Sequence, residues 1–155
     1  SVSRGLGDVY KRQRSSAAII NEQKKNTSEG NQTAIEAMHK IKQSAIDTKL
    51  ALLKGDVGEF ARILGEGWEN KKKMAGAITN PMIQEAFDVA TGAGAMAGKV
   101  SGAGGGGFIM FVVEPTRKEE VVRALNNLNG FVMPFQFIDD GAHGWKIYST
   151  DKVQK

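Results

Sequence analysis

A run of glycines near the middle of the chain is the segment best suited to bind a charged ligand. Five of the six residues from Gly102 to Gly107 are glycine, and a chain without Cβ atoms can adopt positive φ angles and approach a ligand closely. Successive N–H groups in such a turn form a concave anion site. Because ordering so many glycines costs conformational entropy, a purely flexible connection is the less favoured alternative. The candidate phosphate loop consists of Ser101, Gly102, Ala103, Gly104, Gly105, Gly106 and Gly107.

The flanking elements distinguish this loop from two common phosphate-binding motifs. The pattern predicts a helix over Pro81 to Ala97 and a strand over Phe108 to Val113. A dinucleotide fingerprint follows a strand and opens a helix, and a P-loop requires Lys and Ser/Thr after its last glycine, where this chain has Phe108. The expected order of helix, loop and strand fits neither motif, which disfavours a dinucleotide-dependent enzyme.

The ten residues from Lys99 to Phe108, KVSGAGGGGF, resemble the third signature motif of the GHMP kinases. The similarity continues in the Asn-Pro-Met-Ile sequence that starts at Asn80 and in the segment 132–137, VMPFQF. Both look like the heptose-phosphate kinase branch of that family, as does the turn Arg14-Ser15-Ser16. The resemblance covers about residues 14–150.

The resemblance implies an α+β, ferredoxin-like domain whose antiparallel sheet has helices packed on one face. The first strand of that sheet would lie upstream of Arg14 and be missing from this chain. The implied reaction transfers the γ-phosphate of ATP, with Mg²⁺, to a hydroxyl of a sugar or sugar phosphate. The loop Ser101–Gly107 would face the nucleotide phosphates, while Arg14 and Lys99 are possible substrate-binding residues. Galactose and mevalonate remain alternative acceptors to heptose 7-phosphate.

The parts of such a kinase that perform catalysis are not found in this sequence. In the family, a Pro-x-x-x-Gly-Leu-Gly-Ser-Ser loop for ATP and the group that handles the acceptor hydroxyl lie in an N-terminal half. Residues 14–155 therefore look like a C-terminal domain without catalytic residues, and we expect it to be inactive alone. Residues 1–13 resemble a translated sequencing adaptor, a non-native tail to be excluded from fold reasoning. A native basic arm is the alternative.

Composition narrows the class of protein. A chain of 155 residues is long enough for one domain with a core. Its net charge is +4, but half of that excess lies in residues 1–13, so we expect no nucleic-acid partner. Lys71-Lys72-Lys73 is interpreted as a solvated helix end. The chain has no cysteine and 2 histidines, which argues against a metal site and fits a reducing cytoplasm.

No apolar stretch approaches the ~18–20 residues needed to span a bilayer, so we expect no membrane partner. A second hypothesis, from a different functional class, is a stand-alone ferredoxin-like module that binds a small ligand through its glycine loop.

Helices are expected first along the chain and strands later, a pattern typical of α+β folds. Gly55 is expected to end a helix, and Asp56 and Asn80 to cap the next ones. Thr116 and Glu119 are expected to form a capping box, and Trp145 to lie in the core. Besides the helix before the loop, the pattern predicts helices over 15–25, 33–54, 57–73 and 116–128, and strands over 108–113, 131–138 and 145–149.

Overall fold

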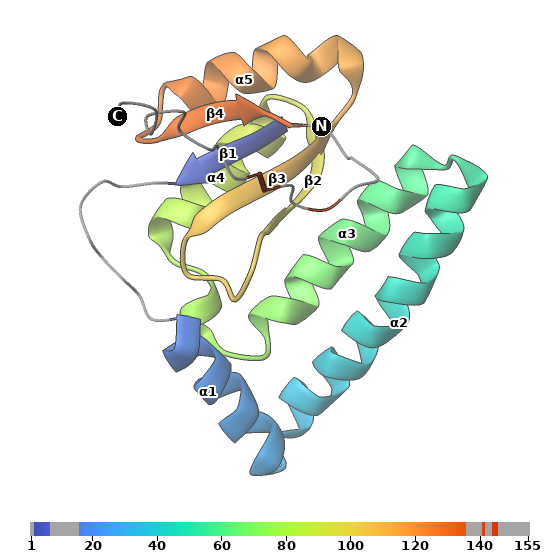
Figure 1. Cartoon of the computed structure of the whole chain (residues 1–155), viewed down its shortest axis with the longest axis vertical. Coiled ribbons are helices and arrows are strands. Elements are labelled where there is room, and N and C mark those ends of the chain that lie inside the picture. The colour runs from blue at the N-terminus through green and yellow to red at the C-terminus, as the bar shows by residue number, and fades with distance from the viewer. Residues whose placement is uncertain (1, 7–15, 136–140, 142–143, 146–155) are drawn as a thin grey trace, which may run out of the picture.

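The computed structural model describes residues 2–6, 16–135, 141, 144 and 145. After one strand near the N-terminus, the chain forms helices up to Gly92, and three of the four strands in these residues follow Gly92 (Figure 1). The helices are α1 (Ser16–Ser28), α2 (Gln32–Lys54), α3 (Val57–Lys72), α4 (Pro81–Gly92) and α5 (Lys118–Asn126), with short 3₁₀ turns η1 (Gly76–Ile78) and η2 (Pro115–Arg117). The strands are β1 (Val2–Leu6), β2 (Ala95–Val100), β3 (Gly107–Val113) and β4 (Phe131–Pro134).

Short-range capping chemistry sets the ends of the long helices. The Asp56 carboxylate accepts a hydrogen bond from the Glu59 N–H at 2.9 Å and caps α3. Gly55 ends α2 at φ +69°, a left-handed conformation that costs glycine nothing. Asn80 caps α4 with Pro81 in its first turn. These three predicted caps are confirmed.

The strands form one antiparallel sheet in the order β2-β3-β1-β4. β3 is an interior strand, as its continuous apolar sequence predicts. Helices α4 and α5 pack on one face of this sheet, α3 runs beside β2, and α2 packs against α3 as an antiparallel hairpin (Figure 1). The expected α+β architecture with helices on one face of an antiparallel sheet is therefore confirmed.

The core lies between the sheet and these helices. The ring of Phe87 in α4 stacks on Trp68 of α3 and meets Phe111 of β3 edge-on, each at 5.3 Å between ring centroids. Gly98 of β2 faces Phe111 so closely that a Cβ there would lie 2.6 Å from the ring. The other fully buried large side chains are Ile78, Ile83, Val100, Ile109, Val121 and Leu125.

The predicted helix from Pro81 to Ala97 is too long. It ends at Gly92, and Gly94 follows at φ +105°, a conformation that a helix does not contain. A Cβ on Gly94 would come within 2.7 Å of Arg117 Nε, so this turn depends on glycine. The next six residues are β2, paired with β3. The glycine loop therefore joins two strands.

The prediction that the first strand of the sheet is missing is also wrong. β1 lies within the suspected tail and occupies the place between β3 and β4. A gap between two strands presents unpaired N–H and C=O groups on both sides, and backbone pairing satisfies them whatever the apolar pattern of the inserted segment. The non-native origin of residues 1–13 stays a prediction.

Two further expectations fail near the end of the chain. Thr116 lies inside the η2 turn, and α5 begins only at Lys118 with no side-chain cap, so the capping box is absent. Trp145 is 82% exposed, so it does not lie in the core, where Trp68 is the buried tryptophan. β4 confirms the start of the strand over 131–138, whereas residues 136–138 and nearly all of 145–149 lie outside the described residues.

Candidate functional site

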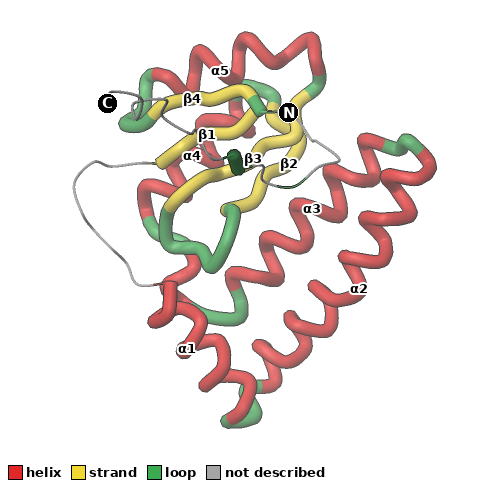
Figure 2. The backbone as a smooth tube through the Cα atoms, viewed as in Figure 1, coloured by secondary structure: helices red, strands yellow, loops and turns green. Residues whose placement is uncertain are grey.

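The glycine loop is a tight turn at the end of the β2–β3 hairpin, lying near the first turn of α1 (Figure 2). The Ser101 N–H donates to the Phe108 carbonyl at 2.8 Å and closes its base. Four positions have φ angles that L side chains rarely adopt: Gly102 (+78°), Gly104 (+109°), Gly105 (+74°) and Gly107 (+89°). The local sequence folds this way because glycine alone adopts such angles without strain.

Ile78, the last residue of η1, and Asn80, the N-cap of α4, form hydrogen bonds with the glycine loop. The Gly105 N–H donates to the Ile78 carbonyl at 2.7 Å, and the Asn80 side-chain amide donates to the Gly105 carbonyl at 3.0 Å. A Cβ on Gly104 would lie 2.8 Å from the same Ile78 oxygen. The Asn80 side-chain oxygen meanwhile accepts from the Ile83 N–H at 3.0 Å. One asparagine thus caps α4 and fixes the loop.

Lys71, at the end of α3, makes a third attachment. Its ammonium donates to the Gly102 carbonyl, whereas its neighbour Lys72 pairs with Glu69 at 2.7 Å on the surface. Burial, and then the positive charge of Lys99, lower the pKa of Lys71. The interpretation of the lysine run as a merely solvated helix end is therefore wrong for Lys71.

The loop encloses one side of a cavity of about 280 Å³ whose lining consists of all seven loop residues and Ser16. Ser16 is the first residue of α1, so the positive end of that helix dipole lies at the cavity. Two long-range hydrogen bonds hold α1 in place. The Glu22 carboxylate accepts from the Gly76 N–H at 2.9 Å, and the Asn26 amide donates to the Met74 carbonyl at 2.8 Å.

The chemistry of this lining suits an anion. Within the described residues, the N–H groups of Gly102, Ala103, Gly104 and Gly106 have no hydrogen-bond acceptor. None of the described residues that line the cavity is acidic, so these residues supply donors and a helix terminus but no general base. This combination can bind and orient phosphate oxygens.

The structure brings the seven predicted loop residues together and places one of the other two candidates, Lys99, at a different pocket. Lys99 lies on β2 opposite Met110 and lines a second pocket between α2 and α3. Arg14 lies outside the described residues, so its substrate-binding role stays a prediction.

Three residues of the site were missed at the level of sequence. The Asn-Pro pair marks Asn80 as a cap but gives no sign of its bond to the loop. Lys71 is 31 residues and Ser16 is 86 residues before Gly102 in the sequence. Neither residue belongs to a motif that would indicate a contact with the loop. Only the resemblance around Ser16 pointed to the start of α1.

The described part of the chain contains neither a cluster of metal-binding side chains nor a membrane-spanning helix. No group of three or more His, Cys, Asp or Glu side chains gathers there in a way that could hold a metal ion. No helix in the same residues is long and apolar enough to cross a membrane.

Known proteins resemble this chain in both sequence and fold. D-glycero-alpha-D-manno-heptose 7-phosphate kinase of Campylobacter jejuni is 42% identical over 118 residues, which are 76% of this chain and 35% of that protein. A crystal structure of a D-glycero-D-manno-heptose 1-phosphate kinase from Bacteroides thetaiotaomicron is 86% identical, with 76% of this chain and 34% of that one covered and a TM-score of 0.57. The chain thus spans about a third of the length of these relatives.

The fold is shared more widely. L. major mevalonate kinase, solved in complex with R-mevalonate, has a TM-score of 0.70 at 17% identity, over 81% of this chain and 37% of that one. The family model described as "GHMP kinases C terminal" matches residues 48–129 and so includes α3, α4 and the whole glycine loop. The chain therefore belongs to the GHMP kinases, as a C-terminal domain of that family.

Proposed function

We propose that this chain is the C-terminal part of an ATP-dependent sugar kinase that transfers the γ-phosphate of ATP to a heptose phosphate. The observation that supports this most strongly is the glycine-loop cavity. Among the described residues, its lining combines backbone N–H groups that have no acceptor with the start of α1 and includes no acidic side chain. Phosphoryl transfer depends on positioning and on electrostatic stabilisation of the phosphoryl oxygens. Donors of this kind act on those oxygens.

In this proposal the loop contributes to binding while another part of the kinase supplies the chemistry. The N–H groups of the loop and the N-terminus of α1 orient the transferring phosphate. Lys71 holds the Gly102 carbonyl and adds positive charge behind the loop. The base that handles the acceptor hydroxyl, the main ATP site and the ligands of Mg²⁺ come from a domain that the relatives carry beyond the aligned third of their length. We place the reaction in the cytoplasm, where ATP is made.

The acceptor is proposed from the two relatives named as heptose-phosphate kinases, which are 42% and 86% identical to this chain. Their names both specify D-glycero-D-manno-heptose, but one gives the 7-phosphate and the other the 1-phosphate. Since the 86% identical protein carries the second name, both sugars belong in the assay. Arg14 is proposed to bind the phosphate already on the sugar, because a guanidinium fork suits phosphate geometry.

A chimaera tests the proposal directly. Residues 16–135 of this chain would replace the corresponding segment of the Bacteroides thetaiotaomicron enzyme, and ADP release would be measured with ATP, Mg²⁺ and each heptose phosphate. We expect turnover that depends on one of these sugars. A folded chimaera that hydrolyses or transfers no phosphate under these conditions would contradict the kinase assignment.

Gly106 offers a way to test the loop without straining it. It lines the cavity, its φ is not in the left-handed region, and an added Cβ would meet no atom within 4 Å. Gly106→Leu should therefore fill the phosphate site and reduce kcat/KM of the chimaera at least tenfold, while its melting temperature changes little. Gly58→Ala, on exposed α3 backbone, is the control. Equal kcat/KM values for Gly106→Leu and the parent would show that the loop is only a connector.

An assay of the isolated chain tests whether the catalytic groups of the kinase lie in another domain. We expect no sugar-dependent ADP release from residues 1–155 by themselves, because no described residue that lines the cavity can act as a general base. Turnover by the isolated chain would refute this division of labour between domains.

A further inference from the structure

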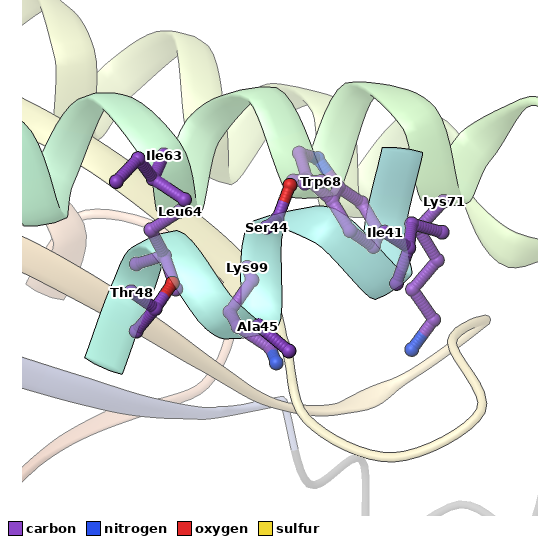
Figure 3. A pocket seen from close by; sticks show the side chains of 10 residues that line it. Ile41, Ser44, Ala45, Thr48, Ile63, Leu64, Trp68, Lys71 and Lys99 are labelled. Carbon is purple, nitrogen blue, oxygen red and sulfur yellow. The ribbon is translucent and has the colours of Figure 1, made fainter. Parts of the chain in front are cut away.

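A second pocket, of about 360 Å³, lies between α2, α3 and β2. Its volume falls in the range of small-molecule sites. It is separate from the glycine-loop cavity, since none of the described residues lines both. Its walls are side chains from all three elements: Ile41, Ser44, Ala45, Thr48, Ile63, Leu64, Gly67, Trp68, Lys71 and Lys99 (Figure 3).

The pocket is divided into an apolar body and a charged end. Ile41, Leu64 and the Trp68 ring give it mainly hydrophobic walls. Figure 3 shows the side chains of Lys71 and Lys99 extending toward the same side of the pocket, the side of the β2–β3 loop. An elongated ligand would therefore contact hydrocarbon along most of its length and two ammonium groups at one end.

In the described part of the chain, no acidic side chain lines the pocket beside these two lysines. None of the ten lining residues is Asp or Glu, and the nearby carboxylates of α3 are engaged elsewhere: Glu59 and Glu66 bind Arg62 at 2.6 and 2.5 Å. Burial lowers the pKa of Lys71, and repulsion by the positive charge of Lys99 lowers it further. A bound anion would relieve that repulsion.

Hydroxyl groups complete the recognition. Ser44 and Thr48 of α2 line the pocket one helical turn apart. The Ser44 hydroxyl donates to the Lys40 carbonyl at 2.9 Å, which leaves its oxygen lone pairs able to accept from a ligand hydroxyl. The two ammonium groups at one end of the pocket and its hydrophobic walls elsewhere favour a ligand with a negatively charged head and a largely apolar body over a neutral ligand.

We propose that the pocket between α2, α3 and β2 is a binding site for a small amphipathic anion, with its acidic group on Lys99 and Lys71 and its apolar body against Trp68. The site is additional to the phosphate loop and does not depend on the proposed kinase activity. Lys71 links the two, because an anion in the pocket competes with the Gly102 carbonyl for the same ammonium group.

The test uses 1-naphthyl phosphate as the probe, with 1-naphthol and inorganic phosphate as its neutral and headgroup-only counterparts. The full chain is titrated and the two indole N–H signals are followed by NMR. Trp68 lines the pocket, whereas Trp145 is 82% exposed and serves as an internal reference. We expect a saturable shift of the Trp68 signal with 1-naphthyl phosphate, and at least tenfold weaker binding of the other two probes.

Variants assign the binding to this pocket. Lys99→Met should weaken 1-naphthyl phosphate about tenfold, and Ala45→Phe should abolish the Trp68 shift by filling the pocket from exposed backbone. Lys49→Met is the matched control for Lys99→Met, because Lys49 is an exposed lysine of α2 that does not line the pocket. Gly106→Leu, which closes the other cavity, should leave the Trp68 shift unchanged.

Three outcomes would overturn the proposal. Equal affinities for 1-naphthol and 1-naphthyl phosphate would mean that the lysines recognise no anion. Unchanged binding in Ala45→Phe would place the probe outside the pocket. Loss of the shift in Gly106→Leu, with the fold intact, would assign the anion to the glycine loop.

Discussion

Replacing Gly104 by alanine should destabilise the domain more than the same change at any other position of the loop. The new Cβ would lie 2.8 Å from the Ile78 carbonyl oxygen, 2.9 Å from Ile78 Cγ2 and 3.0 Å from Ile78 Cα. Relief by moving the neighbour is costly, because that oxygen also accepts the 2.7 Å hydrogen bond from the Gly105 N–H. The substitution therefore attacks the contact that supports the loop.

The expected magnitude has two parts. A positive φ costs an L residue about 1–2 kcal/mol, and Gly104 lies at +109°. Overpacking against a rigid neighbour adds about 1–3 kcal/mol. The free energy of unfolding should thus fall by about 2–5 kcal/mol, a large fraction of the stability of a single domain.

Two other loop glycines serve as matched controls that separate the cost of the positive φ angle from the cost of overpacking. Gly102 has φ +78° but open space around its Cβ position, so Gly102→Ala should cost only the conformational part, about 1–2 kcal/mol. Gly106 has neither constraint, and Gly106→Ala should change stability by less than about 0.5 kcal/mol or increase it slightly.

Urea denaturation followed by far-UV circular dichroism measures all three variants, provided that the slope m stays constant. The expected order of stability is Gly106→Ala, then Gly102→Ala, then Gly104→Ala. If Gly104→Ala were no less stable than Gly102→Ala, the loop would not rest on Ile78 and the described support of the site would be wrong.

Three further predictions concern residues around the loop. Asn80→Ala should lower the free energy of unfolding by about 2 kcal/mol in urea, because it removes a helix cap and the hydrogen bond to Gly105; a cost near zero would contradict this double role. Thr116→Ala should change thermal stability within about 0.5 kcal/mol, since its side chain caps no helix; a loss near 1 kcal/mol would restore the capping box. The lowered pKa of Lys71 means that the unfolded chain binds more protons as pH approaches the usual lysine value of 10.5. Stability of the wild type should therefore rise with pH relative to Lys71→Met, and parallel urea midpoints from pH 8 to 10 would refute the burial of this ammonium.

Short-range signals in the sequence predicted much of the fold. Gly55, Asp56 and the Asn80-Pro81 pair mark helix ends because their own backbone or side-chain geometry satisfies the terminal N–H and C=O groups. The glycine loop could likewise be identified as a candidate anion site, since the positive φ angles it needs depend on residue type. The resemblance of residues 99–108 to a GHMP kinase motif predicted the type of domain to which the loop belongs.

Tertiary contacts decided what these local rules left open. Small residues such as Ala95 and Ala97 are compatible with a helix, and only pairing with β3 makes that segment a strand. β1 has its place because β3 and β4 leave a gap whose backbone groups need partners.

The same division holds for the site. The sequence by itself determined which residues form the glycine loop, because the positive φ angles of that loop require glycine. Only the tertiary structure decided that Lys71 and Asn80 hold the loop, that Ser16 brings a helix terminus to it, and that Lys99 turns to a second pocket. Those contacts join residues far apart in the chain, and their energy appears only when packing of the helices against the sheet brings the partners together.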